Sequence, residues 1–200
     1  MKLTPAERRE RRRESLLAAA FDLFSAHPVD AVSMADVVKR AGGSLQTCYG
    51  FFPSKQALME ALVDRLRAQL FDRQAPLAEQ APRDMLVEAA ARLRALATSA
   101  EFQTMMRLAR NIKLRDPGYG VALRSDIAAI GCTLTALFER WRFEQPGLCA
   151  TLFVGAVIGE AQLPGLMGDA ARGEGECALI RAAVDLFAPD TAKEIDQGKA

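Results

Sequence analysis

Apolar side chains recur along most of the chain at intervals of three and four residues, the spacing that places them on one face of an α-helix. In the first such segment, residues 14–26, Leu17, Phe21 and Phe24 follow this spacing. The same spacing and the breaks at proline, glycine and serine predict further helices at residues 34–41, 45–51, 55–74, 83–98, 102–114, 120–142, 148–163 and 177–187. No segment alternates like a strand and no internal repeat is evident, so we expect an all-α fold of about nine helices.

Local signals mark the ends of the second and third of these segments. Ser33 followed by Asp36 is the acidic form of a capping box, which satisfies free N–H groups at a helix start. The pair Gly42-Gly43 can end that helix, because glycine accepts the left-handed geometry of a helix terminus. Ser44 can then cap the next segment, residues 45–51. Two short helices joined by a tight glycine turn, with a third helix ahead of them, predict a helix-turn-helix.

The segment after the glycine turn is polar where a buried helix would be apolar. Glutamine can pair with adenine, threonine can reach a base or a phosphate, and leucine can contact a thymine methyl group. The Tyr49 hydroxyl and the Lys55 ammonium suit phosphates, and Lys55 opens the following helix at its positive end. The candidate DNA-binding residues are Ser33, Ser44, Leu45, Gln46, Thr47, Tyr49 and Lys55.

The distribution of charge along the chain is more informative about binding partners than the net charge. The 200 residues are 50% hydrophobic and 26% charged, as in folded soluble proteins, and the net charge is only +1. Residues 1–55 nevertheless hold nine Lys/Arg against six Asp/Glu, while the remainder holds 17 against 19. Arg8–Arg13 concentrates this positive charge. Such a run is either a solvated tail or a phosphate-binding arm, and the residues alone leave both open.

Metal, redox and membrane roles find little support. The four cysteines stand at positions 48, 132, 149 and 177 with no CxxC spacing, so we expect reduced thiols and neither a metal site nor a redox pair. The basic N-terminus lacks the apolar run of a signal peptide, and no stretch approaches the roughly 18 apolar residues of a membrane span. We therefore expect a cytoplasmic protein that does not bind membranes.

Enzymatic motifs are also missing. The sole histidine, His27, lies at a helix end beside Pro28, where the helix dipole favours it as a cap and not as a base. HExxH, GxSxG and P-loop motifs are absent. Residues 173–178, GEGECA, nominally match a dinucleotide fingerprint, but no strand precedes them and the glutamates would repel pyrophosphate. We expect no catalytic residue and no cofactor.

Residues 33–55, SMADVVKRAGGSLQTCYGFFPSK, resemble the N-terminal domain of the TetR/AcrR family of bacterial repressors. The shared pattern is Ser-Met-x-x-Val-x-x-x-Ala-Gly-x-Ser, then Thr-x-Tyr-x-x-Phe-Pro-Ser-Lys, and the similarity covers about residues 14–62. The resemblance implies a DNA-binding helix-turn-helix domain at residues 1–55. It also implies a variable helical domain at residues 56–200 that binds a small molecule and forms a homodimer through its last two helices. We expect a ligand-responsive repressor that a small molecule releases from double-stranded operator DNA.

Four residues depart from the family pattern. Gly43 replaces a usual valine and Cys48 a common leucine, which predicts a smaller core under the third helix at a cost of about 1–3 kcal/mol. Gly50 costs about 1 kcal/mol inside a helix and removes a side chain that often reaches phosphate in relatives. Leu45 replaces a commonly polar or basic residue. These changes predict an unusual sequence preference and a weaker phosphate clamp. Gly43, Cys48 and Gly50 also keep open an alternative: a helical interaction protein that has lost DNA binding.

The two late apolar helices, residues 148–163 and 177–187, are the predicted dimer surface. Small residues on the first allow close helix approach, and the second offers an apolar stripe. The candidates are Leu152, Gly155, Ala156, Gly159, Ile180, Ala183, Val184 and Phe187. For either helix alone, it is equally plausible that these apolar residues pack in the core of a single chain.

Methionine and aromatic residues between the two ends of the chain are the predicted ligand site. Methionine adapts to variable ligands, and aromatic side chains line apolar cavities. The candidates are Phe102, Met105, Met106, Arg110, Phe138, Trp141 and Phe153. This pattern indicates an apolar or aromatic effector, although without the family such a stripe is more often plain core. Arg107 and Arg110 leave open an anionic group on the effector, and they are equally well explained as part of a solvated face.

Overall fold

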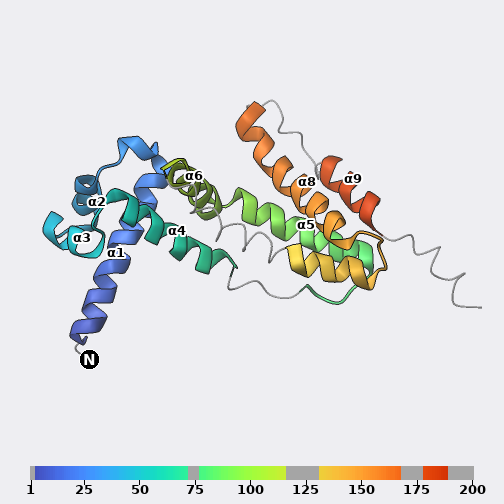
Figure 1. Ribbon diagram of the computed structural model, residues 1–200, viewed down its shortest axis with the longest axis horizontal. Helices are drawn as coiled ribbons and strands as arrows, with labels where there is room; N and C mark the ends of the chain where they lie inside the picture. Colours follow the sequence, from blue (N-terminus) through green and yellow to red (C-terminus); the bar gives the residue numbers. More distant parts are fainter. Residues whose placement is uncertain (1–2, 72–76, 116–130, 168–177, 189–200) are drawn as a thin grey trace, which may run out of the picture. The chain divides into compact units, whose positions relative to one another are not determined.

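The computed structural model describes residues 3–71, 77–115, 131–167 and 178–188. Within these ranges the chain forms α-helices and one short 3-10 helix, and no strand, which confirms the all-α class (Figure 1). The elements are α1 (Pro5–Ala26), η1 (Val29–Ala31), α2 (Met34–Ala41), α3 (Leu45–Phe51), α4 (Lys55–Phe71), α5 (Pro82–Thr98), α6 (Ala100–Arg115), α8 (Pro146–Met167) and α9 (Ala178–Phe187). Residues 131–140 are also helical.

The structure extends two helices beyond their predicted ends. The arginine-rich segment is helical, because Thr4 and Glu7 form a capping box and Pro5 occupies the first helical position, where its missing N–H is not needed. α8 passes the predicted stop at Pro164-Gly165, since a proline removes one backbone donor without preventing helix beyond it. The predicted helical residues 72–74, 120–130 and 177 lie outside the described residues.

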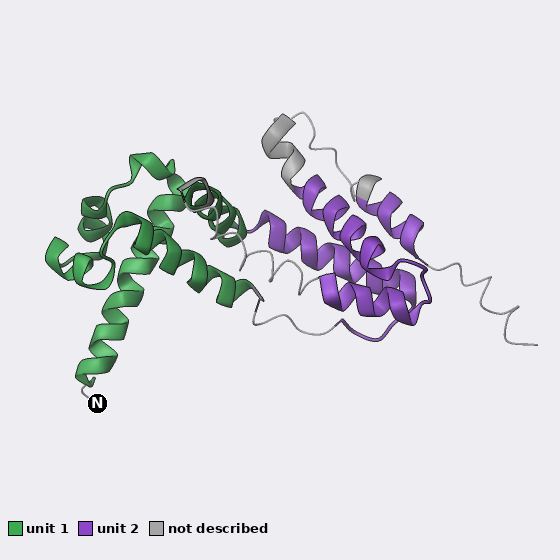
Figure 2. Cartoon of the chain, viewed as in Figure 1, with its two compact units in different colours: residues 1–74, 100–124 green, residues 75–99, 125–200 purple. Residues whose placement is uncertain are grey.

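The chain divides into two compact units (Figure 2). Residues 1–74 and 100–124 form unit 1, and residues 75–99 and 125–200 form unit 2. This grouping differs from the division at residue 55 that the sequence predicted. The difference arises because α6 packs against α1 and α4, and so belongs with the helices that precede it.

Unit 1 is built around α1, whose apolar face contacts α2, α4 and α6. Its largest fully buried side chains are Leu16, Leu17, Phe24, Leu58, Met59, Leu62, Leu66, Phe102 and Met105. Polar contacts fix the end of α1: the Arg107 guanidinium donates to the carbonyls of Phe24 and Ser25 at 3.0 and 3.2 Å. The last carbonyls of a helix have no partner within it, so Arg107 of α6 serves as a C-terminal cap for α1.

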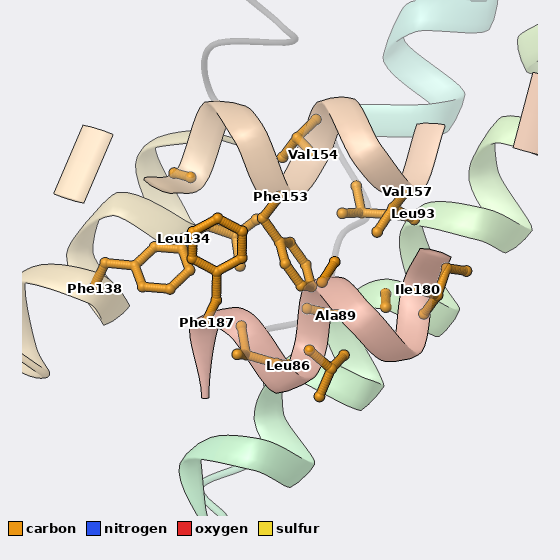
Figure 3. Close-up of a cluster of buried hydrophobic side chains, with 14 residues drawn as sticks. Leu86, Ala89, Leu93, Leu134, Phe138, Phe153, Val154, Val157, Ile180 and Phe187 are labelled. Atoms are coloured by element: carbon orange, nitrogen blue, oxygen red, sulfur yellow. The ribbon is translucent and has the colours of Figure 1, made fainter. Parts of the chain in front are cut away.

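Unit 2 packs α5, α8, α9 and residues 131–140 around an apolar cluster (Figure 3). Aromatic rings occupy its centre. The ring of Phe187 lies 5.6 Å from that of Phe138 and 6.2 Å from that of Phe153, in edge-to-face geometry. Trp141 meets Phe138 in the same manner, at 5.7 Å.

The described helices contain none that is both long and apolar enough to cross a membrane. The same residues contain no group of three or more His, Cys, Asp or Glu side chains placed to hold a metal ion.

Candidate nucleic-acid interface

Serine caps fix the starts of the two helices of the helix-turn-helix. The Ser33 hydroxyl accepts from the Asp36 N–H at 3.2 Å, and the Asp36 carboxylate accepts from the Ser33 N–H at 2.9 Å. The hydrogen bonds from Ser33 lower the pKa of Asp36 below its usual value. The Ser44 hydroxyl accepts from the Thr47 N–H at 3.2 Å at the start of α3. Both predicted caps are confirmed, and the hydroxyl of the exposed Ser33 is hydrogen-bonded within its cap.

α3 presents one exposed face and one buried side chain. Leu45 and Tyr49, four residues apart and so on the same face, are 43% and 49% exposed, and Gln46 and Thr47 are also exposed. Cys48 is fully buried, and this burial raises the pKa of its thiol. The Cys48 side chain of α3 therefore packs against the other helices of unit 1, while the polar side chains of α3 face solvent.

Lys55 is less free than the sequence suggested. Its ammonium donates to the Val29 carbonyl of η1 at 2.6 Å, and its side chain is half-buried. An ammonium group carries three donors, so two remain for a phosphate after this bond. Lys55 thus ties the start of α4 to η1 while keeping donors available.

The glycine turn between α2 and α3 is held by an arginine of α1. Gly42 and Gly43 have φ of 75° and 86°, in the region that side chains rarely adopt. The Arg12 guanidinium donates to the Ala41 carbonyl at 2.8 Å and to the Gly42 carbonyl. A Cβ at Gly43 would lie 2.5 Å from Arg12 Nη2. The expected loss of core at position 43 is therefore wrong: Gly43 is exposed, and Arg12 fills the space beside it.

Other arginines of the predicted basic arm also contact protein. The Arg9 guanidinium lies 5.5 Å from the ring centre of Phe51, and that of Arg13 lies 5.9 Å from that of Phe52. Arg11, by contrast, is exposed, and no hydrogen bond or ion pair joins it to another described residue.

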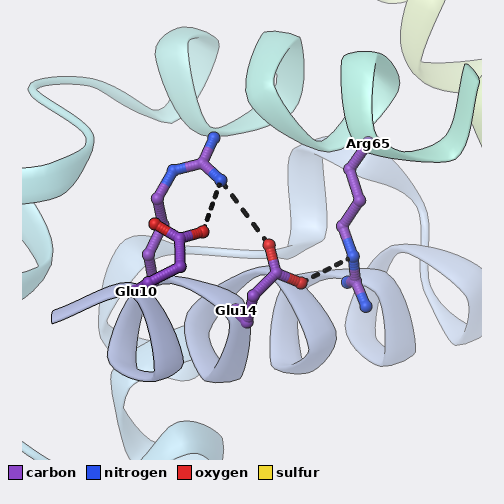
Figure 4. Close-up of polar contacts among 4 residues, drawn as sticks. Glu10, Glu14 and Arg65 are labelled. Atoms are coloured by element: carbon purple, nitrogen blue, oxygen red, sulfur yellow. Dashed lines mark ion pairs between the residues drawn. The ribbon is translucent and has the colours of Figure 1, made fainter. Parts of the chain in front are cut away.

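An ion-pair network continues from the arm to α4 (Figure 4). Arg13 lies 3.5 Å from both Glu10 and Glu14, and Glu14 lies 3.0 Å from Arg65 Nε. The sequence left open whether the basic run is a solvated tail or a phosphate-binding arm. In the structure, part of the run is an ordered helix face that contacts α3 and α4.

Gly50 lies in α3 with open space around it, since a Cβ there would meet nothing within 4 Å. It leaves no gap in the core, and its cost is confined to backbone flexibility.

The predicted ligand-binding residues divide between the two units. Phe102 and Met105 are buried in unit 1, Met106 is half-buried there, and Arg110 is exposed. The remaining three, Phe138, Trp141 and Phe153, belong to the aromatic cluster of unit 2. The ligand assignment stays a prediction.

The predicted dimer residues also separate into two groups. Leu152 is 54% exposed on α8, and Gly155 and Gly159 are exposed with Ala156 half-buried beside them. The α9 residues Ile180, Ala183, Val184 and Phe187 are instead buried in the apolar cluster of their own chain. Their assignment to a partner-facing surface is corrected accordingly, because the apolar stripe of α9 packs inward on α5 and α8. The exposed apolar residue of α9 is Leu186, at 73%.

Sequence reasoning missed Arg12 and Arg107 as structural contacts. Both reach backbone carbonyls far along the chain, and a contact of that kind leaves no local pattern. One signal for Arg12 was present, because an unusual glycine at position 43 leaves room for a neighbouring side chain.

Known regulatory proteins resemble the part of unit 1 that holds the helix-turn-helix. Residues 16–62 match the family model for bacterial regulatory proteins of the tetR family, a family of regulators and not of enzymes. An uncharacterized HTH-type transcriptional regulator, YvdT of Bacillus subtilis (strain 168), is 37% identical over 59 residues, which span 30% of each chain.

Solved structures resemble about nine tenths of the chain at low identity. A TetR-family transcriptional regulator from Mesorhizobium loti MAFF303099 has a TM-score of 0.70 and 22% identity, covering 90% of this chain and 96% of that one. The Flavonoid-responsive Regulator FrrA has a TM-score of 0.63 and 24% identity, covering 88% and 92%. At such identities the likeness establishes a shared fold.

Proposed function

We propose that this chain is a regulator of the tetR family, whose model its residues 16–62 match, and that it regulates transcription by binding double-stranded DNA through α3. One observation carries this proposal. α3 is capped, anchored by a buried Cys48 and leaves Leu45, Gln46 and Tyr49 exposed. A rigid helix with exposed hydrogen-bonding groups fits the major groove of a duplex.

Each exposed group of α3 has a defined chemistry in a groove. The Gln46 amide can pair with the N6 and N7 atoms of adenine, a contact worth about 1–3 kcal/mol of discrimination. Leu45 can contact a thymine methyl group, and the Tyr49 hydroxyl can donate to a phosphate. The Thr47 hydroxyl lies 2.9 Å from the Ser44 hydroxyl. The two hydroxyl groups would therefore contact the same part of the DNA sugar-phosphate backbone.

Two copies of α3 are needed, because one helix of this length grips too few base pairs for specificity. We place the homodimer contact on the outward faces of α8 and α9, where Leu152 and Leu186 are exposed. Leu148, four residues before Leu152 and so on the same face of α8, is also exposed. Such a dimer would carry its readers to half-sites about 34–36 Å apart.

The effector is proposed to be an apolar or aromatic small molecule. The fold resembles that of FrrA, a flavonoid-responsive regulator. An aromatic ligand would stack on Trp141, which is half-buried at the edge of the cluster that Phe138 and Phe153 fill. Binding would release DNA only if the ligand prefers one of two arrangements of the readers. We propose on this basis a ligand-released repressor, and we expect it to act in the cytoplasm.

The alternative of an interaction protein without DNA binding rested on Gly43, Cys48 and Gly50. In the structure Arg12 occupies the space at Gly43, Cys48 is packed, and Gly50 lies in the open. None of the three deforms α3, so the regulator is the better-supported function.

Selection from a random-sequence duplex library tests the proposal. The full-length protein should recover a two-fold symmetric sequence, and Gln46→Ala should bind the recovered duplex about tenfold or more weakly. Gln69→Ala is the matched control, since Gln69 is an exposed glutamine on α4. Recovery of no duplex at low salt would favour the interaction protein.

A further inference from the structure

The C-terminal end of α2 is held by α1 at two points. Arg40 of α2 donates to the Asp22 carboxylate at 2.7 and 2.9 Å, which joins the two helices along their sides. Arg12 reaches the last carbonyls of α2, at Ala41 and Gly42. These carbonyls lack partners within the helix, and the helix dipole favours a positive charge beside them. Arg12 is therefore an arginine cap supplied from another helix.

Position 43 and Arg12 are complementary in shape. Gly43 has no side chain, and the Cζ of Arg12 lies only 3.0 Å from where its Cβ would be. With φ of 86°, any other residue would also be strained there. The guanidinium thus occupies the place of a side chain in the turn, and a larger residue at position 43 would displace it.

This turn sets the direction of α3. Gly43 is followed at once by Ser44, whose hydroxyl caps α3, so the backbone that Arg12 holds leads directly into the proposed reader. The other end of α3 meets the same face of α1, because Arg9 and Arg13 lie over Phe51 and Phe52. Residues 9, 12 and 13 share a helix face by their spacing. Arginines of α1 therefore contact the turn that leads into α3 and the C-terminal end of α3.

We propose that Arg12 is a positioning residue for DNA recognition: it orients α3 through the turn and does not itself bind phosphate. This inference rests on the proposed function. Arg11, next to it in the run, is exposed and makes no polar contact with another described residue. The two neighbours therefore have different roles, Arg12 in specificity and Arg11 in phosphate attraction.

The test compares Arg12→Ala, Arg12→Lys and the matched control Arg11→Ala. The probes are the tightest duplex that the wild-type protein recovers from a random library, and poly(dI-dC) as non-specific DNA. Dissociation constants are measured for both probes over a range of NaCl concentrations. Arg12→Ala should lower the ratio of specific to non-specific affinity about tenfold, with the salt slope unchanged. Arg11→Ala should weaken both probes alike and reduce the slope by about 0.9. Arg12→Lys should fall between, because lysine keeps the charge without the two-pronged geometry.

A double-mutant cycle with Gly43→Ala guards against a general loss of folding. The new methyl group should expel the guanidinium, so Gly43→Ala should lower the specificity ratio as Arg12→Ala does. Gly43→Ala should then lower the specificity ratio less in the Arg12→Ala background than in the wild-type protein. Additive losses would overturn the proposal. If Arg12→Ala proves unfolded by circular dichroism, Arg12→Lys and Gly43→Ala decide the question.

Two further outcomes are distinguishable. If Arg12→Ala weakens both probes equally and lowers the salt slope by about 0.9, Arg12 contacts phosphate, and the inference fails while the DNA-binding function stands. If the wild-type protein recovers no duplex, the proposed function fails and the inference fails with it.

Discussion

The Lys55 ammonium donates a hydrogen bond of 2.6 Å to the Val29 carbonyl. This bond joins the first residue of α4 to η1, the short 3-10 helix between α1 and α2. The sequence suggested that Lys55 binds phosphate, and the structure shows that it also stabilises the loop that precedes α2. Both roles can be separated experimentally.

Lys55→Ala should lower the free energy of unfolding by about 1–2 kcal/mol, because a hydrogen bond from a charged donor to a half-buried carbonyl is lost. Urea denaturation measures this change. Lys39→Ala, at an exposed lysine of α2, is the control and should unfold like the wild-type protein. An unfolding midpoint for Lys55→Ala equal to that of the control would assign Lys55 to DNA alone.

Gly50→Ala should stabilise the protein by about 0.5–1 kcal/mol, since alanine reduces the freedom of the unfolded chain and its Cβ meets open space. The comparison is Gly43→Ala, which should destabilise because of its positive φ and the contact with Arg12. Thermal unfolding of the two variants should move in opposite directions. A decrease for Gly50→Ala would mean that α3 requires glycine there.

Cys48 predicts a pH dependence of stability. Burial raises the pKa of its thiol above the ordinary value of 9.0, so the folded chain holds this proton to higher pH than the unfolded chain does. The associated stability is complete below the ordinary pKa and is lost as the pH rises through the folded one. The free energy of unfolding should thus fall more steeply above pH 9.0 for the wild-type protein than for Cys48→Ala. Parallel curves would contradict the burial of this thiol.

Leu152→Glu should dissociate the proposed dimer without unfolding the chain, because Leu152 is exposed on α8 and a charge there opposes an apolar contact. Sedimentation velocity should show a monomer at concentrations where the wild-type protein is a dimer. Val87→Glu introduces the same charge at an exposed apolar residue of α5 and should stay dimeric. A dimeric Leu152→Glu would move the interface away from this face.

Local signals predicted the helix-turn-helix well. Ser33, Asp36 and Ser44 act within three residues of their own positions, so their capping roles could be read from the sequence. The start of α1 was missed although Thr4 and Glu7 carry the same type of signal, because the arginines between them and the apolar face suggested a tail.

Contacts between segments that are distant in the sequence could not be predicted from such local signals. The apolar period of α9 is the same whether Ile180 and Val184 face the interior of their own chain or a partner, and only packing on α5 and α8 decides it. The contact of Arg12 with the glycine turn depends on how α1 and α2 cross. Such relationships between distant segments have no counterpart in a local pattern.

The central claim, that α3 reads the major groove, is tested most directly by replacing single adenines of the selected duplex with 7-deazaadenine, which removes the N7 acceptor. At one adenine of each half-site the replacement should weaken binding by the wild-type protein about tenfold, and it should leave the affinity of Gln46→Ala unchanged. If no adenine position shows this loss, or if Gln46→Ala loses as much as the wild-type protein does, the assignment of Gln46 and α3 to the groove is contradicted.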